Sequence, residues 1–240
     1  MEILLSLRHK STISSKVLHE SQMYRILDAR NRGFRMNKKM LDLFSGLGGA
    51  SEAFLNNGWE VKRIENNPEL SLVPNTEMMD IQQFEEFVSL IIAAGGDPAR
   101  PTLIWASPPC TDFSDGYNSP KSKARRSRID YFPAASIELV KCTMRIIKLL
   151  QPKYWILENV KGSVEFLEPI LGPPQMIIDS IYLWGNFPKW SMPPGYKHVK
   201  NDSAWSSHPL RANIRAKIPY AVSDACRQSI ENTKTLDYWF

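Results

Sequence analysis

From Met40 onward, short apolar runs alternate with longer segments in which apolar residues recur every three or four positions. This alternation constrains the fold more than any other feature, because it is typical of parallel strands connected by helices. The four runs of strand length predict strands at Met40–Phe44, Glu60–Ile64, Thr102–Ala106 and Tyr154–Leu157. The fold class that follows is α/β, with a mostly parallel sheet flanked by helices.

Three helices are predicted around these strands, at Ala50–Asn56, Gln82–Ala94 and Ala134–Leu150. The second is ended by Gly95-Gly96, and the third by Gln151-Pro152. In the third helix, apolar residues at spacings of three and four form one stripe. We expect this stripe to pack against the sheet.

Composition places the chain among ordinary globular proteins. Of its 240 residues, 43% are hydrophobic and 23% are charged, which excludes disorder across the whole chain. No apolar run approaches the ~18 residues of a membrane span, and the first residues lack the apolar stretch of a signal peptide. We therefore expect a soluble, intracellular protein with no membrane contact.

Positive charge is concentrated at the beginning of the chain. Residues 1–40 hold nine Lys and Arg and three acidic residues, and the rest of the chain has a net charge of −1. We interpret residues 1–35 as a basic, poorly ordered extension; a start at Met36 and a nucleic-acid-binding arm are the alternatives. Residues 36–160 are the predicted core. Residues 161–240, rich in Pro and Trp, are predicted to form a small, irregular C-terminal lobe.

The three cysteines are an odd number without paired spacing, so neither a disulfide framework nor a metal site is expected. Cys142 and Cys226 fit buried, small apolar positions. Cys110 differs, because it follows Ser107-Pro108-Pro109 directly after a predicted strand. Two prolines fix the backbone there and would present the thiol at the carboxyl end of the sheet, where α/β folds bind ligands. We interpret Cys110 as a nucleophile, with a buried apolar cysteine as the alternative.

A glycine-rich turn follows the first predicted strand, in the segment Asp42-Leu-Phe-Ser-Gly-Leu-Gly-Gly49. Glycines at a strand-to-helix junction allow a tight turn and the close approach of a ligand. Glu65 follows the next predicted strand, where an acidic residue typically binds the ribose hydroxyls of a nucleoside cofactor. The segment is not GxGxxG, which favours an adenosine-type cofactor without a pyrophosphate. A simple glycine turn with a solvated acid is the alternative.

A third motif, Glu158-Asn159-Val160, follows the last predicted strand. A carboxyl group there can converge with the Cys110 thiol on one cleft, because the ends of parallel strands meet at one edge. Burial beside an apolar strand would raise its pKa and keep it able to donate a proton. The alternative is an acid that caps a helix or lies at an edge.

The three motifs, in this order, resemble those of the DNA cytosine-C5 methyltransferase family. The resemblance covers about Met40 to Val160 and implies a Rossmann-like fold with helices on both faces of the sheet. It implies S-adenosylmethionine as cofactor, with a covalent Cys110 adduct on a flipped cytosine and Glu158 as the acid. The cofactor-binding residues that it implies are Phe44, Gly46, Gly48, Gly49, Glu65, Asp80 and Pro109. For Asp80, a helix N-cap is the alternative.

Residues 111–130 correspond to the mobile loop of that family, and five of them are basic. By resemblance these five would contact DNA phosphates; an ordinary solvated loop is the alternative. They are Lys121, Lys123, Arg125, Arg126 and Arg128.

The chain departs from the family pattern after Val160. It has no Gln-x-Arg-x-Arg segment, and Arg215-Ala216 stand where Gly-Asn is expected. The segment available for reading bases is short, which predicts low or very short sequence specificity. We expect a monomeric DNA methyltransferase of prokaryotic or viral-host cytoplasm. An RNA cytosine methyltransferase and a catalytically silent binding protein are the alternatives.

Overall fold

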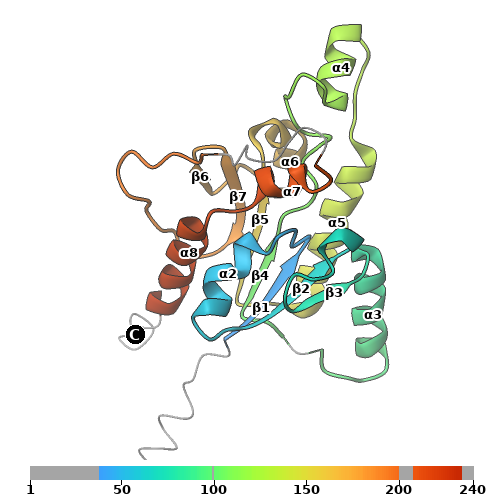
Figure 1. The fold of residues 1–240 in the computed structure, drawn as a ribbon. Helices are drawn as coiled ribbons and strands as arrows, with labels where there is room; N and C mark the ends of the chain where they lie inside the picture. The colour runs from blue at the N-terminus through green and yellow to red at the C-terminus, as the bar shows by residue number, and fades with distance from the viewer. Residues whose placement is uncertain (1–37, 99, 200–207, 234–240) are drawn as a thin grey trace, which may run out of the picture. The chain divides into compact units, whose positions relative to one another are not determined.

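The computed structural model describes residues 38–98, 100–199 and 208–233. The proposed basic extension, Met36 and Trp205 lie outside the described residues. A seven-stranded sheet in the order β3-β2-β1-β4-β5-β7-β6 forms the centre of the described part (Figure 1). None of the described helices is long and apolar enough to cross a bilayer.

Five strands of this sheet are parallel to one another. Four of them match the predicted strands closely, and the three-residue β3 was not predicted. Strand β5 runs two residues past its predicted end. The five are β1 (Lys39–Leu43), β2 (Glu60–Glu65), β3 (Thr76–Met78), β4 (Leu103–Ala106) and β5 (Tyr154–Asn159).

Two antiparallel strands, β6 (Met176–Ile178) and β7 (Ile181–Asn186), extend the sheet beyond β5. The prediction of an irregular segment after residue 161 is therefore wrong for this part of the chain. Gly185 allows β7 to lie close to β5, because a Cβ there would stand 2.0 Å from the Trp155 carbonyl oxygen. The C-terminal segment thus continues the sheet that carries the predicted motifs.

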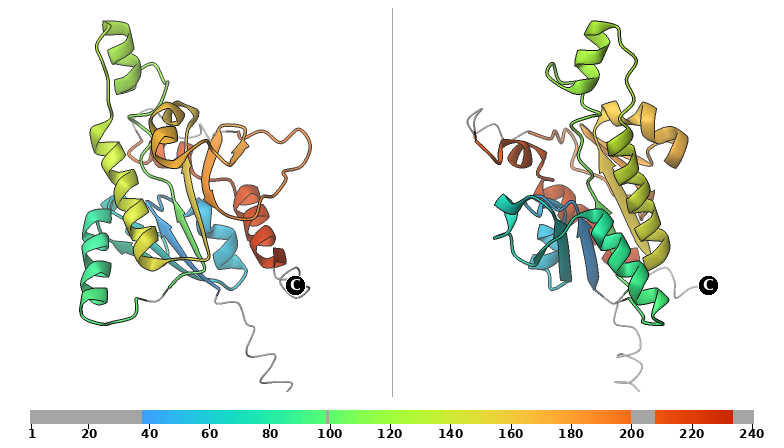
Figure 2. Two further views of the ribbon diagram at one scale, coloured as in Figure 1. Left: turned by 180° about the vertical axis from the view of Figure 1, so that it is seen from behind. Right: turned by 90° about the vertical axis from the view of Figure 1, so that its right-hand side faces the viewer.

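Helices cover both faces of the sheet (Figure 2). On one face α3 packs against α5, and on the other α2 packs against α8. The three predicted helices are present. The helices are α2 (Gly49–Asn56), α3 (Ile81–Ala93), α4 (Pro120–Ser127), α5 (Ala134–Leu150), α6 (Val164–Leu171), α7 (Arg211–Ala216) and α8 (Tyr220–Asn232), with short 3-10 helices η1 (Pro68–Leu70) and η2 (Lys161–Ser163).

The main core lies between the sheet and the helices α3 and α5. Strand residues such as Leu43 and Ile104 are fully buried there against Val88 and Ile146. Burial of this apolar surface holds the strands in register. The loops at the carboxyl ends of the strands therefore start from fixed positions. Cys142 belongs to this core, and Cys226 is buried in α8, as predicted for both.

Candidate active site

The three sequence motifs lie at one edge of the sheet. The strands β2, β1, β4 and β5 are consecutive and parallel, and each motif follows or ends one of them. Phe44–Gly49 follows β1, Ser107–Cys110 follows β4, and Glu158 and Asn159 end β5. This carboxyl edge is where open α/β sheets bind their ligands.

Hydrogen bonds join the cysteine loop directly to the end of β5. The buried Asn159 donates from Nδ2 to the Pro108 carbonyl oxygen at 3.1 Å. The Ser107 hydroxyl donates to Glu158 and itself accepts from the Trp105 indole N–H at 3.1 Å. The loop that presents the partly exposed Cys110 is therefore held against the strand that carries the acid.

Glu158 lies inside β5, opposite Leu183 of β7, and not after the strand as predicted. Burial raises the pKa of its carboxyl from 4.5 to about 7, and the hydrogen bond from Ser107 opposes this shift. A carboxyl group with this pKa exists in both protonation states near neutral pH. It can therefore donate a proton and take it back.

The glycine loop between β1 and α2 is strained into left-handed conformations. Phe44, Gly46 and Gly48 have φ angles of 56°, 53° and 73°. Glu65 stabilises the loop, because its Oε2 accepts from the Gly46 N–H at 2.8 Å. Its Oε1 accepts from the backbone N–H groups of the two residues that follow, Asn66 and Asn67. Of about four acceptor positions on a carboxylate, these bonds use three.

The first and second halves of the loop differ in exposure. Phe44 and Gly46 are partly exposed, whereas Gly48 and Gly49 are buried by the protein. A Cβ at Gly48 would stand 2.6 Å from the Arg63 Cζ, and one at Gly49 would stand 2.5 Å from the Ile218 carbonyl oxygen. Gly48 and Gly49 thus allow close packing beneath the loop.

Arg63, which the sequence analysis did not single out, lies under this loop and is 3% exposed. Its guanidinium donates to the Ser51 hydroxyl at 2.9 Å, to the Pro74 carbonyl at 2.6 Å and to the Gly48 carbonyl at 3.4 Å. Ser51 in turn donates to Asp42 at 2.5 Å. Burial raises the pKa of Asp42, while the Ser51 hydrogen bond and the charge of Arg63 oppose the shift.

Asp80 caps α3, which was the alternative to its cofactor role. Its Oδ1 accepts from the Gln82 N–H at 2.8 Å, and Gln83 completes a capping box. Its other oxygen accepts from the Asn66 amide at 3.2 Å. Asp80 therefore lies beside the residues that follow Glu65, at the same edge of the sheet.

The basic segment contains a helix, α4, where the sequence analysis expected a loop. In Figures 1 and 2, α4 projects from the end of α5 away from the sheet. Four of the five predicted DNA-binding residues are exposed on it or next to it: Lys123, Arg125, Arg126 and Arg128. The fifth, Lys121, is 7% exposed and bonded within the protein, so it does not face phosphates.

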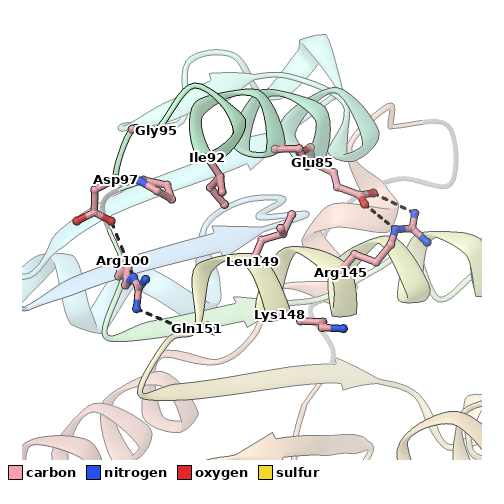
Figure 3. Close-up of a pocket in the computed structure, with 12 residues that line it drawn as sticks. Glu85, Ile92, Gly95, Asp97, Arg100, Arg145, Lys148, Leu149 and Gln151 are labelled. Atoms are coloured by element: carbon pink, nitrogen blue, oxygen red, sulfur yellow. Dashed lines mark hydrogen bonds and ion pairs between the residues drawn. The ribbon is translucent and has the colours of Figure 1, made fainter.

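A cavity of about 660 Å³ lies at the opposite edge of the sheet (Figure 3). It is lined by the C-terminal ends of α3 and α5 and by the turn before β4. Among its polar side chains, Arg145 pairs with Glu85, and Arg100 pairs with Asp97 and donates to Gln151. None of the three motifs contributes to it. Across the described residues, no cluster of His, Cys, Asp and Glu could hold a metal ion.

Comparison with known protein families identifies the arrangement. The model of the C-5 cytosine-specific DNA methylase family matches residues 38–167, which include β1 to β5 and all three motifs. The chain belongs to this family. It is a member of the DNA cytosine-5-methyltransferases, as the motif order predicted.

Two Type II methyltransferases of Herpetosiphon aurantiacus are similar to this family member. M.HgiGI is 28% identical over 132 residues, which are 52% of this chain and 92% of that protein. M.HgiDI is 28% identical over 133 residues, and the match spans 38% of its length.

Solved structures show weaker likenesses. A protein described as a DNA modification methyltransferase of an E. coli prophage is 19% identical, with a TM-score of 0.41, over 62% of this chain and 46% of that one. A SAM-dependent methyltransferase from Agrobacterium tumefaciens is 14% identical, with a TM-score of 0.38, over 63% of this chain and 56% of that one. The fold assignment rests on the sheet topology described above.

Replacing Arg63 by Met should destabilise the protein strongly, because the Ser51 hydroxyl and two carbonyl groups would lose their buried donor and Asp42 would lose a nearby positive charge. The expected loss is about 3–5 kcal/mol of unfolding free energy, measured by urea denaturation. Lys62→Met is the matched control on the same strand. Its side chain is about half exposed and, among the described residues, is paired with Glu77 alone, so its loss should be within about 1 kcal/mol. Equal losses in the two variants would contradict this role of Arg63.

Proposed function

We propose that the protein transfers a methyl group from S-adenosylmethionine to carbon 5 of cytosine in DNA, through a covalent Cys110 adduct on a flipped base. One observation carries the proposal. The Ser107–Cys110 loop is hydrogen-bonded to Glu158 and Asn159, so the thiol and the acid belong to one rigid unit at the carboxyl edge. Family membership supplies the reaction class.

The glycine loop fits the cofactor. A Cβ at Gly46 would meet, among described residues, only the Asn213 Nδ2 within 4 Å, so the loop is open at this point. Glu65 keeps about one acceptor position, which a ribose hydroxyl can use. Phe44, Asp80 and Pro109 are partly or fully exposed around the loop and are the further proposed contacts. When bound, S-adenosylmethionine supplies an electrophilic methyl group.

The chemistry of the two side chains is complementary. Carbon 5 of cytosine is a weak nucleophile until the Cys110 thiolate forms a bond to carbon 6. Glu158 donates its proton to N3, and the ring electrons then make carbon 5 able to accept a methyl group. Loss of the carbon 5 proton and release of the thiolate restore the aromatic ring. The raised pKa of Glu158 suits this exchange.

Carbon 6 is inaccessible in a stacked duplex, so the cytosine must leave the helix at a cost of a few kcal/mol. The four exposed cations on and next to α4 support contact with the phosphates of the opened strand. Tyr117, 75% exposed, lies against Arg126, whose guanidinium carbon is 4.0 Å from the ring centre. This segment offers both charge and an aromatic surface beside the Cys110 loop.

The structure beyond β5 supports recognition of a very short target sequence. Within the described residues, this segment adds two strands to the sheet and the three helices α6, α7 and α8, of which α8 packs against α2. The aromatic residues Trp184 and Phe187 of this segment are buried in the core and are not available to stack on bases. This segment is short, whereas reading base edges takes several side chains placed together in a groove. We propose that residues 161–240 complete the catalytic domain.

Cys110→Ser should abolish methyl transfer and covalent trapping on DNA that contains 5-fluorocytosine, because a hydroxyl is a much weaker nucleophile than a thiolate. Binding of S-adenosylmethionine, measured by calorimetry, should persist. Cys226→Ala serves as control, since this thiol is buried in α8 and should leave trapping intact. Trapping by Cys110→Ser would show that the nucleophile is another residue.

Glu158→Gln should lower kcat/KM by ~10²–10⁴, the usual effect of losing general acid catalysis. The pKa of Glu158 is raised to about 7, so the fraction of enzyme holding the proton falls as the pH rises through this value. One ionisation near pH 7 should therefore be present in the wild-type pH profile of kcat/KM and missing in the variant. Profiles of identical shape would remove Glu158 from the proton transfer.

Bisulfite sequencing of DNA from cells that express the protein tests the target. We expect methylated cytosines within a context of very few bases, because the segment after Val160 that could read bases is short. A long, strictly defined methylated site would contradict the proposed low specificity. DNA from cells that express Cys110→Ser provides the background.

A further inference from the structure

We propose that Lys121 is a positioning residue for the methyl transfer, which fastens the segment after Cys110 to the segment after Glu158. The inference rests on the proposed function of these two residues. It also separates Lys121 from the other four basic residues of its segment, with which the sequence had grouped it.

The Lys121 ammonium group is held by three oxygen atoms. Nζ donates to the Gly162 carbonyl at 2.9 Å and pairs with Glu165 at 2.5 Å and Asp115 at 3.1 Å. The lysine side chain is 8% exposed, whereas the two carboxylates are half exposed or more. A buried ammonium group must be paired because its desolvation is costly, and here all three of its hydrogens have acceptors.

The backbone makes a second contact at the same place. A Cβ at Gly162 would stand 2.1 Å from the Phe113 carbonyl oxygen, so the two main chains touch. Phe113 follows Cys110 closely and is fully buried, and Gly162 follows Glu158 closely in η2. We call this contact between residues 113–121 and 162–165 the seam.

A lysine at position 121 does not stabilise helix α4, so its presence there needs another explanation. Ser119 caps the helix and Pro120 begins it, so Lys121 lies in the first turn. The helix dipole favours acidic residues there and disfavours a cation. The contacts across the seam compensate for this and explain why a lysine occupies the position.

Chemistry at the cytosine ring depends on where the thiol stands relative to the acid. A displacement of 1 Å at a reacting group can cost ~10²-fold in rate. The seam lies next to both groups in the chain and also anchors the base of α4. Without Lys121, the segment from Cys110 to α4 would keep one contact fewer with the segment that follows Glu158. The expected defect is in the reaction step and not in DNA attraction.

Two lysines on one helix separate positioning from phosphate contact. Lys121→Met should lower kcat by ~10–10²-fold with an unchanged KM for DNA and unchanged salt dependence. Lys123→Met, which removes an exposed cation, should raise KM for DNA and reduce the salt slope of binding by about 1. If Lys121→Met instead raised KM and reduced the salt slope, Lys121 would be a phosphate contact and the proposal would be overturned.

A second readout does not depend on activity. Trypsin cleavage after Arg125, Arg126 and Arg128 in the free protein reports local opening of α4. We expect faster cleavage in Lys121→Met and the wild-type rate in Lys123→Met. Should Cys110→Ser retain trapping, the proposed chemistry would fail while this result would still test the seam. Wild-type cleavage and wild-type kcat in Lys121→Met would refute the positioning role.

Two further variants test the seam if Lys121→Met fails to fold. Glu165→Gln removes the charge of one half-exposed partner, and Gly162→Ala pushes the two main chains apart without changing any charge. Both should accelerate cleavage at α4 and lower kcat at unchanged salt dependence. Wild-type behaviour of both would overturn the proposal.

Discussion

The hydrogen bonds from Asn159 to the Pro108 carbonyl and from Ser107 to Glu158 hold the candidate site together. They connect segments that are far apart in the chain, and they exist because β4 and β5 are neighbours in the parallel sheet. The two prolines leave the Cys110 loop little freedom to relax away. The register of the sheet thus determines where the Cys110 thiol lies relative to the Glu158 carboxyl group.

Much of the fold could be predicted because buried parallel strands and amphipathic helices leave strong patterns. The strands β3 and β6 were missed because three residues carry no period, and β7 because its Trp and Gly resembled a loop. The motif positions could be predicted from strand ends alone. Their hydrogen bonds could not, because partners such as Pro108 and Asn159 are set by tertiary packing.

Lys121 and Arg63 illustrate what composition cannot reveal. Lys121 has the same chemistry as Lys123, two positions away, yet one is buried in ion pairs and the other is exposed. The segment that faces this helix, residues 162–165, determines which of the two lysines is buried. The sequence gives a weak indication of the role of Arg63. It is a charged residue among the buried positions of β2, and such a residue has to find partners inside the protein.

The distribution of buried charge is itself an argument for the site. Among the described residues, the buried charged side chains are Asp42, Arg63, Glu65 and Lys121. The first three lie in the carboxyl halves of β1 and β2, and the fourth lies in the segment that follows Cys110. Burying a charge costs several kcal/mol unless it is paired, so a fold selected for stability alone would spread or avoid such groups. Their concentration around one edge indicates selection for what that edge does.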